Sequence, residues 1–321
     1  MDVTTDYFIE VKDELTLREL SENNFLPAHR PIIGGGSNIL LTKHITGVVL
    51  HNKIKGIEKD KEDDNYVWVT VGSGEIWHDF VMYAIANNWA GIENLALIPG
   101  TVGAAPIQNI GAYGAEVKDV IDHVTAWHWE SKQLYPYYNK ECAFGYRDSI
   151  FKHQLKDRVF ITSVTFRLKK QAIFNTSYGA IEEQLQKMDV KEISIGAIAD
   201  AVIAIRSSKL PNPHEIGNAG SFFKNPVISN ELYDAIKASY PAIPSYSADD
   251  EHVKVPAGWL IEQCGWKGFR AGDTGVHEKQ ALVLVNYGHA TGKALWELSD
   301  NIIKTVKDKF HILLEREVQV W

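Results

Sequence analysis

Cysteine is scarce in this chain of 321 residues. The two cysteines, Cys142 and Cys264, are too few for a disulfide framework or a thiolate metal cluster, and they suit a reducing compartment. The 12 histidines are scattered without the spacing of metal ligands. The sequence therefore predicts a protein that has neither disulfides nor a metal.

Long apolar runs and an N-terminal leader are also missing. No stretch reaches the ~20 apolar residues that a membrane helix requires. The first six residues, MDVTTD, contain neither a basic start nor an apolar run, so we expect no signal peptide. Together these absences predict a cytoplasmic protein.

Positive charge is in deficit, because 33 Lys and Arg residues stand against 41 Asp and Glu residues, for a net charge of −8. Proteins that bind nucleic acids or membrane surfaces rely on bulk positive charge, so we expect neither partner. Anionic small ligands are not excluded, since they need only a few local donors. The composition, 45% hydrophobic and 23% charged, is ordinary for a globular protein, and the length suggests about two domains.

Helical and strand-like patterns are mixed along the chain. Apolar residues recur at helical spacing within residues 76–89, 194–209 and 295–310. Other apolar runs predict strands at residues 66–71, within 122–174, at 281–285 and at 312–321. The polar stretch 58–65 is expected to be a solvated loop or hairpin tip. Residues 207–225, which are rich in proline and glycine, predict the junction between two domains.

The first of two glycine-rich loops spans residues 31–41. Gly34, Gly35 and Gly36 precede Ser37 and Asn38 there, between two apolar runs. Consecutive N–H groups without side chains can form a concave donor nest that suits phosphate. The spacing matches neither the Rossmann dinucleotide fingerprint nor a P-loop, which needs a lysine after the glycines. A tight turn between strands is at least as good an explanation of the triple glycine.

The second loop, residues 98–114, contains four glycines and two prolines and almost no charge. A solvent-exposed loop would carry Asp, Lys or Glu, so this one predicts backbone held against something large, flat and partly apolar. Two such loops in one half of the chain fit a dinucleotide cofactor. The alternative is a pair of buried turns around a core.

The two loops together resemble the flavin-binding segment of the UDP-N-acetylenolpyruvoylglucosamine reductases, also called UDP-N-acetylmuramate dehydrogenases. Further blocks resemble this family in the same order: GYRDSIFK at 145–152, GNAGSFFKNP at 217–226, AGWLIEQ at 257–263 and LEREV at 314–318. Each block alone is modest evidence. Together they span nearly the whole chain and are highly specific.

The resemblance implies an α+β fold that combines a two-part FAD-binding region, of the vanillyl-alcohol-oxidase type, with a separate α/β substrate-binding domain. Residues 1–208 would form the FAD-binding region, split near residues 60–70 and completed by 311–321, and residues 209–310 would form the substrate-binding domain. It also implies that FAD is bound non-covalently. The residues that would hold it are Gly34, Gly35, Gly36, Ser37, Asn38, Pro99, Gly100, Thr101, Gly103, Ala104, Asn109, Gly111, Ala112, Tyr113 and Gly114.

The resemblance also implies a reaction. Members of this family reduce UDP-N-acetylglucosamine enolpyruvate to UDP-N-acetylmuramate through FAD and NADPH, in bacterial peptidoglycan precursor synthesis. Ser221 matches the family's proton donor, and Arg147 and Glu317 match the residues that polarise the substrate carboxylate. A serine hydroxyl held in a dry site can give a proton to a strongly basic enolate. Without the resemblance, Ser221 would be interpreted as a turn serine, and Arg147 and Glu317 as surface residues.

Four further residues are predicted to contact the substrate. Tyr178 and Lys209 match the groups that hold the UDP diphosphate, and a phenol and an ammonium both donate to phosphate oxygens. The loop that carries Tyr178 places the chain in the family's first type. Asn225 and Gln263 are predicted to make polar contacts with the substrate. The implied partners are the enolpyruvyl UDP-sugar and NADPH, and we expect a monomer.

The end of the chain departs from the family pattern. Gln319 follows Val318, where the family usually has an arginine and a longer tail. The resemblance therefore leaves the role of the last residues open.

Two other functions compete with the reductase. A sugar or alcohol oxidase on the same kind of flavin fold would often tether its flavin through a histidine in the first glycine loop, and residues 34–38 contain none. A non-catalytic protein that binds a nucleotide sugar would carry these loops without flavin. Bound FAD and reoxidation by air distinguish the three.

Overall fold

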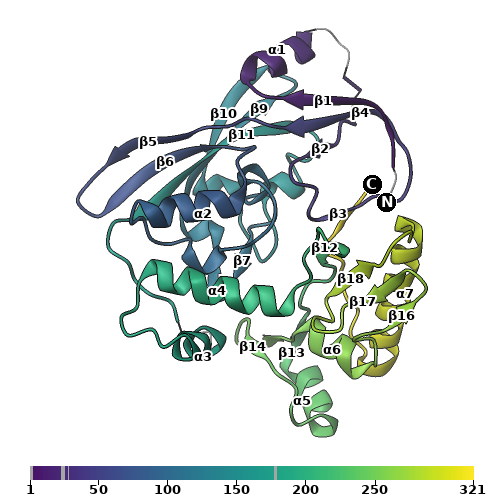
Figure 1. Ribbon diagram of the computed structural model, residues 1–321. Coiled ribbons are helices and arrows are strands. Elements are labelled where there is room, and N and C mark those ends of the chain that lie inside the picture. Colours follow the sequence, from purple (N-terminus) through teal and green to yellow (C-terminus); the bar gives the residue numbers. More distant parts are fainter. Residues whose placement is uncertain (1–2, 23–25, 28, 177–178) are drawn as a thin grey trace. The chain divides into compact units, whose positions relative to one another are not determined.

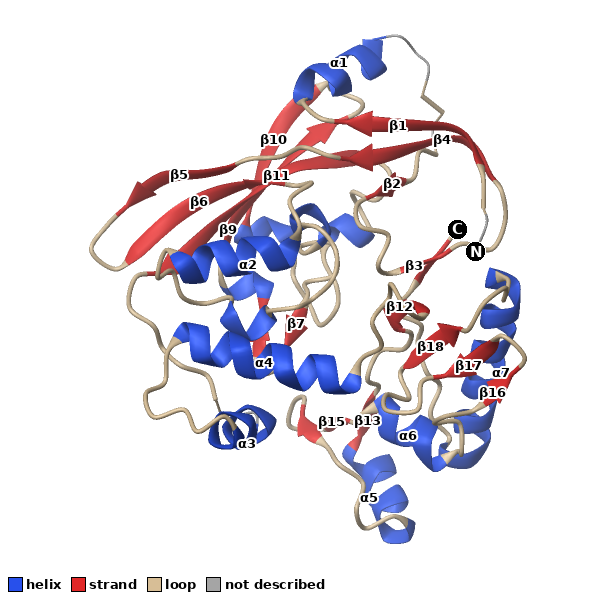
Figure 2. Ribbon diagram, viewed as in Figure 1, coloured by secondary structure: helices blue, strands red, loops and turns tan. Residues whose placement is uncertain are grey.

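The computed structural model describes residues 3–22, 26–27, 29–176 and 179–321 (Figure 1). Contacts divide the chain into two compact units, each of which is discontinuous in sequence. Unit 1 contains the residues up to 4 together with 37–44 and 209–321, and unit 2 contains 5–36 and 45–208. Both units mix helices with strands (Figure 2).

Unit 2 is built on a five-stranded antiparallel sheet with the strand order β10-β9-β11-β6-β5. Its strands are β5 (Ile57–Glu62), β6 (Tyr66–Gly72), β9 (Ile121–His128), β10 (Gln133–Tyr138) and β11 (Val159–Lys169). A three-stranded parallel sheet, of order β1-β4-β2, contains β1 (Thr5–Val11), β2 (Ile32–Ile33) and β4 (Ile45–Asn52). A small hairpin joins β7 (Gly111–Ala112) and β8 (Ala115–Glu116).

Two helices of unit 2, α2 (Trp77–Ala86) and α4 (Ile195–Lys209), follow predicted apolar stripes. The helices α1 (Glu14–Glu22) and α3 (Gly179–Lys187) were not predicted. Ser194, at the start of the predicted stripe 194–209, caps α4, because its Oγ accepts a hydrogen bond from the Ala197 amide at 3.1 Å. Trp77 and Phe80 of α2 pack against Phe166 of β11, with the two phenylalanine rings 4.8 Å apart. Burying an aromatic or aliphatic side chain of this kind contributes about 1.5–3 kcal/mol.

Strand β11 is buried over most of its length, and its two faces serve different clusters. Ile161, Val164 and Phe166 belong to the large core that also contains α2 and α4. Phe160 instead packs with Leu50 of β4 in a smaller cluster. Layers on both faces explain why most residues of this strand are buried.

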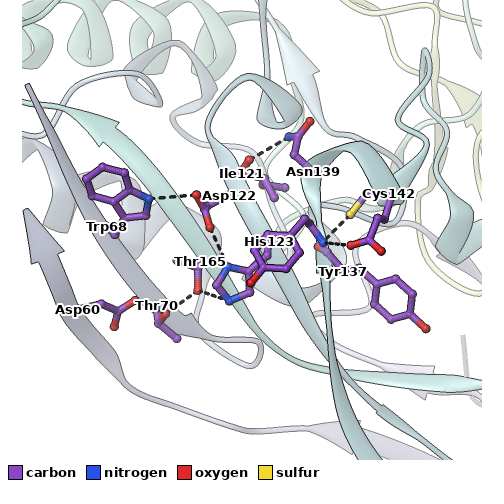
Figure 3. A network of polar contacts seen from close by, with 12 residues as sticks. Asp60, Trp68, Thr70, Ile121, Asp122, His123, Tyr137, Asn139, Cys142 and Thr165 are labelled. Atoms are coloured by element: carbon purple, nitrogen blue, oxygen red, sulfur yellow. Dashed lines mark hydrogen bonds and ion pairs between the residues drawn. The ribbon is translucent and has the colours of Figure 1, made fainter.

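A chain of polar contacts crosses four neighbouring strands of the large sheet (Figure 3). Asp122 Oδ2 lies 2.9 Å from His123 Nδ1, and His123 Nε2 lies 3.2 Å from Thr165 Oγ1. Thr165 Oγ1 is 2.6 Å from Thr70 Oγ1, which donates to Asp60 Oδ2 at 2.7 Å. These contacts help to explain why residues 57–62 form an edge strand. The prediction of a loop was wrong for 58–62, and only residues 63–65 form the turn.

Unit 1 contains three smaller sheets. The four-stranded sheet consists of β12 (Gly217–Ser221), β18 (Val283–Asn286), β17 (Thr274–Val276) and β16 (Arg270–Ala271). The three-stranded sheet consists of β13 (Val227–Ser229), β15 (His252–Lys254) and β14 (Tyr246–Ser247). Near the C-terminus, β19 (Gln319–Val320) pairs in parallel with β3 (Ile39–Leu40).

The core of unit 1 forms around α7 (Gly292–Phe310), with α6 (Ala257–Gln263) and α5 (Asn230–Ser239) as the other helices. The predicted stripe of α7 is buried, which confirms the helix; it contains Leu295, Leu298, Ile302, Val306 and Phe310. The predicted C-terminal strand is much shorter than expected, because only Gln319–Val320 and an isolated bridge at Arg316 pair with other strands.

One unit boundary falls between residues 208 and 209, inside the predicted junction. The contacts also place residues 37–44 and 311–321 in unit 1, whereas the sequence analysis expected 311–321 to complete the N-terminal region. Which segments bind flavin and which bind substrate stays a prediction. In the described ranges, no helix has the length and apolar character needed to span a bilayer.

Candidate active site

The two glycine-rich loops meet within unit 2. A methyl group added to Gly34 would overlap the Thr101 hydroxyl, and one added to Gly35 would lie 3.3 Å from the Gly100 Cα. Gly103 is equally confined, because an added Cβ would lie 2.5 Å from the Ser73 Cβ. Glycine at positions 34 and 35 therefore allows the first loop to rest directly on the second, whereas Gly103 allows the second loop to pack against Ser73.

Several backbone amides of these loops donate no hydrogen bond. Gly34, Gly35 and Gly36 of the first loop, and Gly100 and Thr101 of the second, have N–H groups that reach no acceptor in the described parts of the chain. Most backbone N–H groups in proteins are paired. Amides gathered on two facing, uncharged loops suit the oxygens of a diphosphate, so these residues fit the FAD that the resemblance implies.

The far part of the second loop is tied to Arg147. Asn109 is fully buried, donates to the Gly145 carbonyl at 2.9 Å and accepts from the Lys118 amide at 3.1 Å. The Arg147 guanidinium donates to the Gly111 carbonyl at 2.5 Å. A Cβ on Gly111 would lie 2.9 Å from the Ala115 carbonyl oxygen and 3.0 Å from Arg147 Nη1, so a larger residue would crowd both neighbours. The structure thus places Arg147 on the loop.

Two residues that the sequence analysis missed hold both ends of the second loop. Arg206 of α4 donates to the Leu97 carbonyl at 3.2 Å. Burial lowers the pKa of Arg206 below its ordinary value, and the nearby Tyr113 phenol offsets only part of this shift. The side chain of Asn94 is buried and donates to the carbonyls of Tyr113 and Asn175, at 3.0 Å each. In the sequence, Arg206 and Lys209 both follow the apolar stripe of α4, and nothing there distinguishes Arg206 as a loop contact.

Replacing Arg206 by methionine should weaken FAD binding about tenfold. The change removes a charged donor to a partly buried carbonyl, which costs about 1.5–3 kcal/mol, and releases both ends of the loop. Titration of FAD into flavin-free protein measures the effect. Arg167, an exposed arginine that stacks on Tyr66, supplies the control variant Arg167→Met. Equal FAD affinity in the two variants would contradict a positioning role for Arg206.

Ser221 lies in unit 1, at the end of β12 (Figure 1). It pairs with Val283 of β18, and Gly220 before it has a φ of +72°, which favours glycine. A Cβ on Gly220 would be 3.8 Å from the Ser37 carbonyl. The Ser221 hydroxyl is partly exposed and makes no hydrogen bond to any described residue. It is therefore not the bonded turn serine that was the alternative.

Glu317 lies beside the serine segment. Its amide donates to the Phe222 carbonyl at 2.9 Å, one residue from Ser221. Its own carbonyl accepts from Asn38 Nδ2 at 3.4 Å. Three segments that are far apart in sequence thus meet in unit 1: the end of the first glycine loop, the serine segment and the C-terminal segment.

The remaining predicted residues are placed as follows. Asn225 Oδ1 accepts from the Ala257 amide at 2.9 Å and so holds the start of α6. Gln263 ends α6, and its carbonyl accepts from Lys309 Nζ at 2.5 Å. Lys209 is exposed at the end of α4. Tyr178 lies outside the described residues.

The described residues contain no group of three or more His, Cys, Asp or Glu side chains that could hold a metal ion. Cys142 is buried against the Tyr137 carbonyl, and burial raises the pKa of its thiol to about 12. This thiol stays protonated at neutral pH and is a poor nucleophile.

Two family models match the chain. Residues 24–132 match the FAD binding domain. Residues 212–321 match the C-terminal domain of UDP-N-acetylenolpyruvoylglucosamine reductase. The first match contains both glycine-rich loops, and the second contains Ser221 and Glu317.

Several curated proteins are similar over nearly their full length. The UDP-N-acetylenolpyruvoylglucosamine reductase of Amoebophilus asiaticus is 50% identical over 99% of this chain and 94% of its own. The protein of the same name from Chromobacterium violaceum is 47% identical over 99% and 94%. Among solved structures, the reductase from Thermus caldophilus has a TM-score of 0.65 at 24% identity, over 98% of this chain and 91% of that one, and shows the fold.

The matched domains and the mixed helix-and-sheet architecture define an FAD-dependent oxidoreductase of the α+β class. The expected fold class is confirmed. The chain belongs to the UDP-N-acetylenolpyruvoylglucosamine reductase family, as the extent of identity to its relatives shows.

Proposed function

We propose that this chain reduces UDP-N-acetylglucosamine enolpyruvate to UDP-N-acetylmuramate, with FAD as its cofactor and NADPH as the reductant, in peptidoglycan precursor synthesis. Family membership supports the substrate. The observation that carries the chemistry is the meeting of Ser221, with its hydroxyl unbonded among described residues, and Glu317 in unit 1. We also infer a monomer in the cytoplasm that needs neither nucleic acid nor membrane, which fits the net charge of −8.

The loops would hold the cofactor through backbone rather than charge. The N–H groups of Gly34, Gly35, Gly36, Gly100 and Thr101 would donate to its diphosphate oxygens. Bound FAD would supply the two-electron hydride chemistry between NADPH and the enolpyruvyl CH2 carbon. The remaining residues of the two loops are proposed to line the same cofactor.

Ser221 would supply the proton that completes the reaction. Addition of hydride at the CH2 carbon leaves an electron pair on the carbon next to the carboxylate. The Ser221 Oγ–H bond would break as a C–H bond forms at that carbon, which gives the lactyl ether, and solvent would return the proton to the serine. Arg147 would stabilise the carboxylate as negative charge develops there, and Glu317 would do so only with its own carboxyl protonated or paired, since like charges repel.

Other residues would bind the UDP part of the substrate. Lys209, exposed at the end of α4, offers an ammonium to the diphosphate. Tyr178 would donate its phenol to the same group, as in the family's first type. Asn225 and Gln263 are proposed as polar contacts nearby; in the structure both make hydrogen bonds at the ends of α6.

A visible spectrum of the purified protein tests the proposal. We expect oxidised flavin absorbance that NADPH bleaches without air and that UDP-N-acetylglucosamine enolpyruvate restores. NADH, compared at equal concentration, tests the preference for NADPH. A colourless protein that takes up no FAD would instead be a binding protein. Rapid reoxidation by air, with a sugar as sole electron donor, would indicate an oxidase.

A further inference from the structure

The segment that carries Glu317 has little regular structure of its own. Residues 312–315 and 317 belong to no strand, and Arg316 forms only an isolated bridge with Phe223. Such a segment does not fix the direction of a side chain by itself. Contacts from neighbouring elements must therefore hold Glu317 in place.

Arg316, the residue before Glu317, makes several contacts with a neighbouring helix. Its guanidinium carbon lies 3.6 Å from the centre of the Trp296 ring. Its Nε donates to Ser299 Oγ at 2.8 Å, and its Nη2 pairs with Asp300. The Arg316 side chain is 18% exposed, so most of it is covered.

These three partners lie on one face of α7. Trp296, Ser299 and Asp300 are spaced i, i+3 and i+4, so their side chains are neighbours on the helix surface. Ser299 is fully buried and donates its own hydroxyl to the Trp296 carbonyl at 2.6 Å, so its oxygen is fixed where it accepts from Arg316. A planar guanidinium can stack on a ring and donate at two edges at once, which a lysine ammonium cannot do.

The same segment also forms hydrogen bonds with residues 222–224, which directly follow Ser221 and β12. The Lys224 amide donates to the Glu315 carbonyl at 2.9 Å, and Lys224 Nζ pairs with Glu315 Oε1 at 2.5 Å. The Glu317 amide donates to the Phe222 carbonyl at 2.9 Å. Glu317 is thus held between the backbone next to Ser221 and the anchor on α7. Asp300 already balances the charge of Arg316. We therefore expect the contacts of Arg316 with α7 to act on Glu317 by fixing its position, and not through the charge of the guanidinium.

We propose that Arg316, stacked on Trp296 and bound to Ser299 and Asp300 of α7, is a positioning residue that sets the Glu317 carboxylate beside Ser221 for the proton-transfer half of the reaction. This inference rests on the proposed function, in which Glu317 acts on the substrate carboxylate. It adds α7 to the structural elements on which the reaction depends.

The test compares the two half-reactions in Arg316→Met holoenzyme. Reduction of the flavin by NADPH should stay within about twofold of the parent. Reoxidation by UDP-N-acetylglucosamine enolpyruvate should slow roughly 10- to 100-fold, because small displacements of a reacting group are costly. Arg316→Lys keeps the charge beside Asp300 but loses the stacked plane, so it should recover only part of the rate. Arg270→Met is the matched control, since Arg270 stacks on Tyr287 at 4.0 Å in the same unit.

A purely structural role predicts a different result. Both half-reactions would then fall together with FAD content and with the thermal midpoint, and Arg316→Lys would restore all of them in parallel. Equal slowing of the two half-reactions overturns the proposal. So does a reoxidation rate in both Arg316 variants equal to that of the Arg270→Met control.

Glu317→Gln separates this inference from the proposed function. Normal reoxidation in Glu317→Gln would remove the role of Glu317, and the inference would fall with it. Slow reoxidation in Glu317→Gln beside normal reoxidation in both Arg316 variants would overturn the positioning role alone. In the double variant we expect the Arg316→Met change to cost at most about twofold more than Glu317→Gln alone, because the two changes act through one carboxylate. Full additivity would contradict the proposal.

Discussion

Replacing Ser221 by alanine is expected to leave reduction of the flavin by NADPH intact and to slow its reoxidation by the enolpyruvyl substrate by roughly 10²–10⁴-fold, the usual contribution of a positioned acid. The structural basis is the Ser221 hydroxyl, which is partly exposed and donates to no described residue. Its removal deletes a proton and leaves no buried acceptor without a partner. Anaerobic rapid mixing, with flavin absorbance as the signal, measures each half-reaction separately.

Two further serine variants sharpen this experiment. Ser221→Cys keeps a transferable proton on a side chain of similar size, so it should recover part of the lost rate. Ser247→Ala removes the hydroxyl of an exposed strand serine in the same unit and should change neither half-reaction. Equal slowing of both half-reactions in Ser221→Ala would exclude Ser221 as the proton donor, because reduction by NADPH needs no proton from it.

The second large effect is expected at Gly34. A Gly34→Ala methyl group would overlap Thr101 Oγ1 and lie 3.3 Å from Thr101 Cγ2. Thr101 is only 8% exposed, so it has little room to move away. Overpacking of this kind costs about 1–3 kcal/mol, and if the loops separate to relieve it, FAD binding should weaken roughly 10- to 100-fold. Titration of FAD into flavin-free protein measures the loss.

The structure also predicts a rescue. Thr101→Ala removes both atoms nearest the new methyl group and leaves Thr101 Cβ 3.4 Å away, an ordinary contact distance. The double variant Gly34→Ala/Thr101→Ala should therefore bind FAD more tightly than Gly34→Ala alone. Gly196→Ala in α4 is the control, because its nearest neighbour would be 3.8 Å away and alanine favours helices. Unchanged affinity in Gly34→Ala, or no recovery in the double variant, would show that close approach of the loops is not required.

The long helices were predictable because their signals are local. The stripe of α7 and the Ser194 cap of α4 depend only on residues a few positions apart. The edge strand β5 was not predictable in this way. Its residues are polar, and what holds them is pairing with β6 and the contact between Thr70 and Asp60, neither of which has a signal within residues 58–62.

The residues of the candidate site show the same contrast between local sequence signals and contacts that form only on folding. The glycine loops and Ser221 could be found because they form contiguous motifs that resemble a family. Arg206, Asn94 and Arg316 could not, since each acts on a segment far away in sequence or through a helix face that no motif records. Family blocks identify the atoms expected to meet the ligand, whereas the groups that hold those atoms in place appear only in the folded chain.

The pairing of β3 with β19 has a consequence for biosynthesis. Residues 37–44 are made long before their partner strand, Gln319–Val320. Leu40 also belongs to the core around α7, so a fragment that begins at residue 209 would lack both a strand and a core side chain. Unit 1 can therefore close only after residues 319–320 have been made, and the segment that contains β3 stays without its partner strand until then.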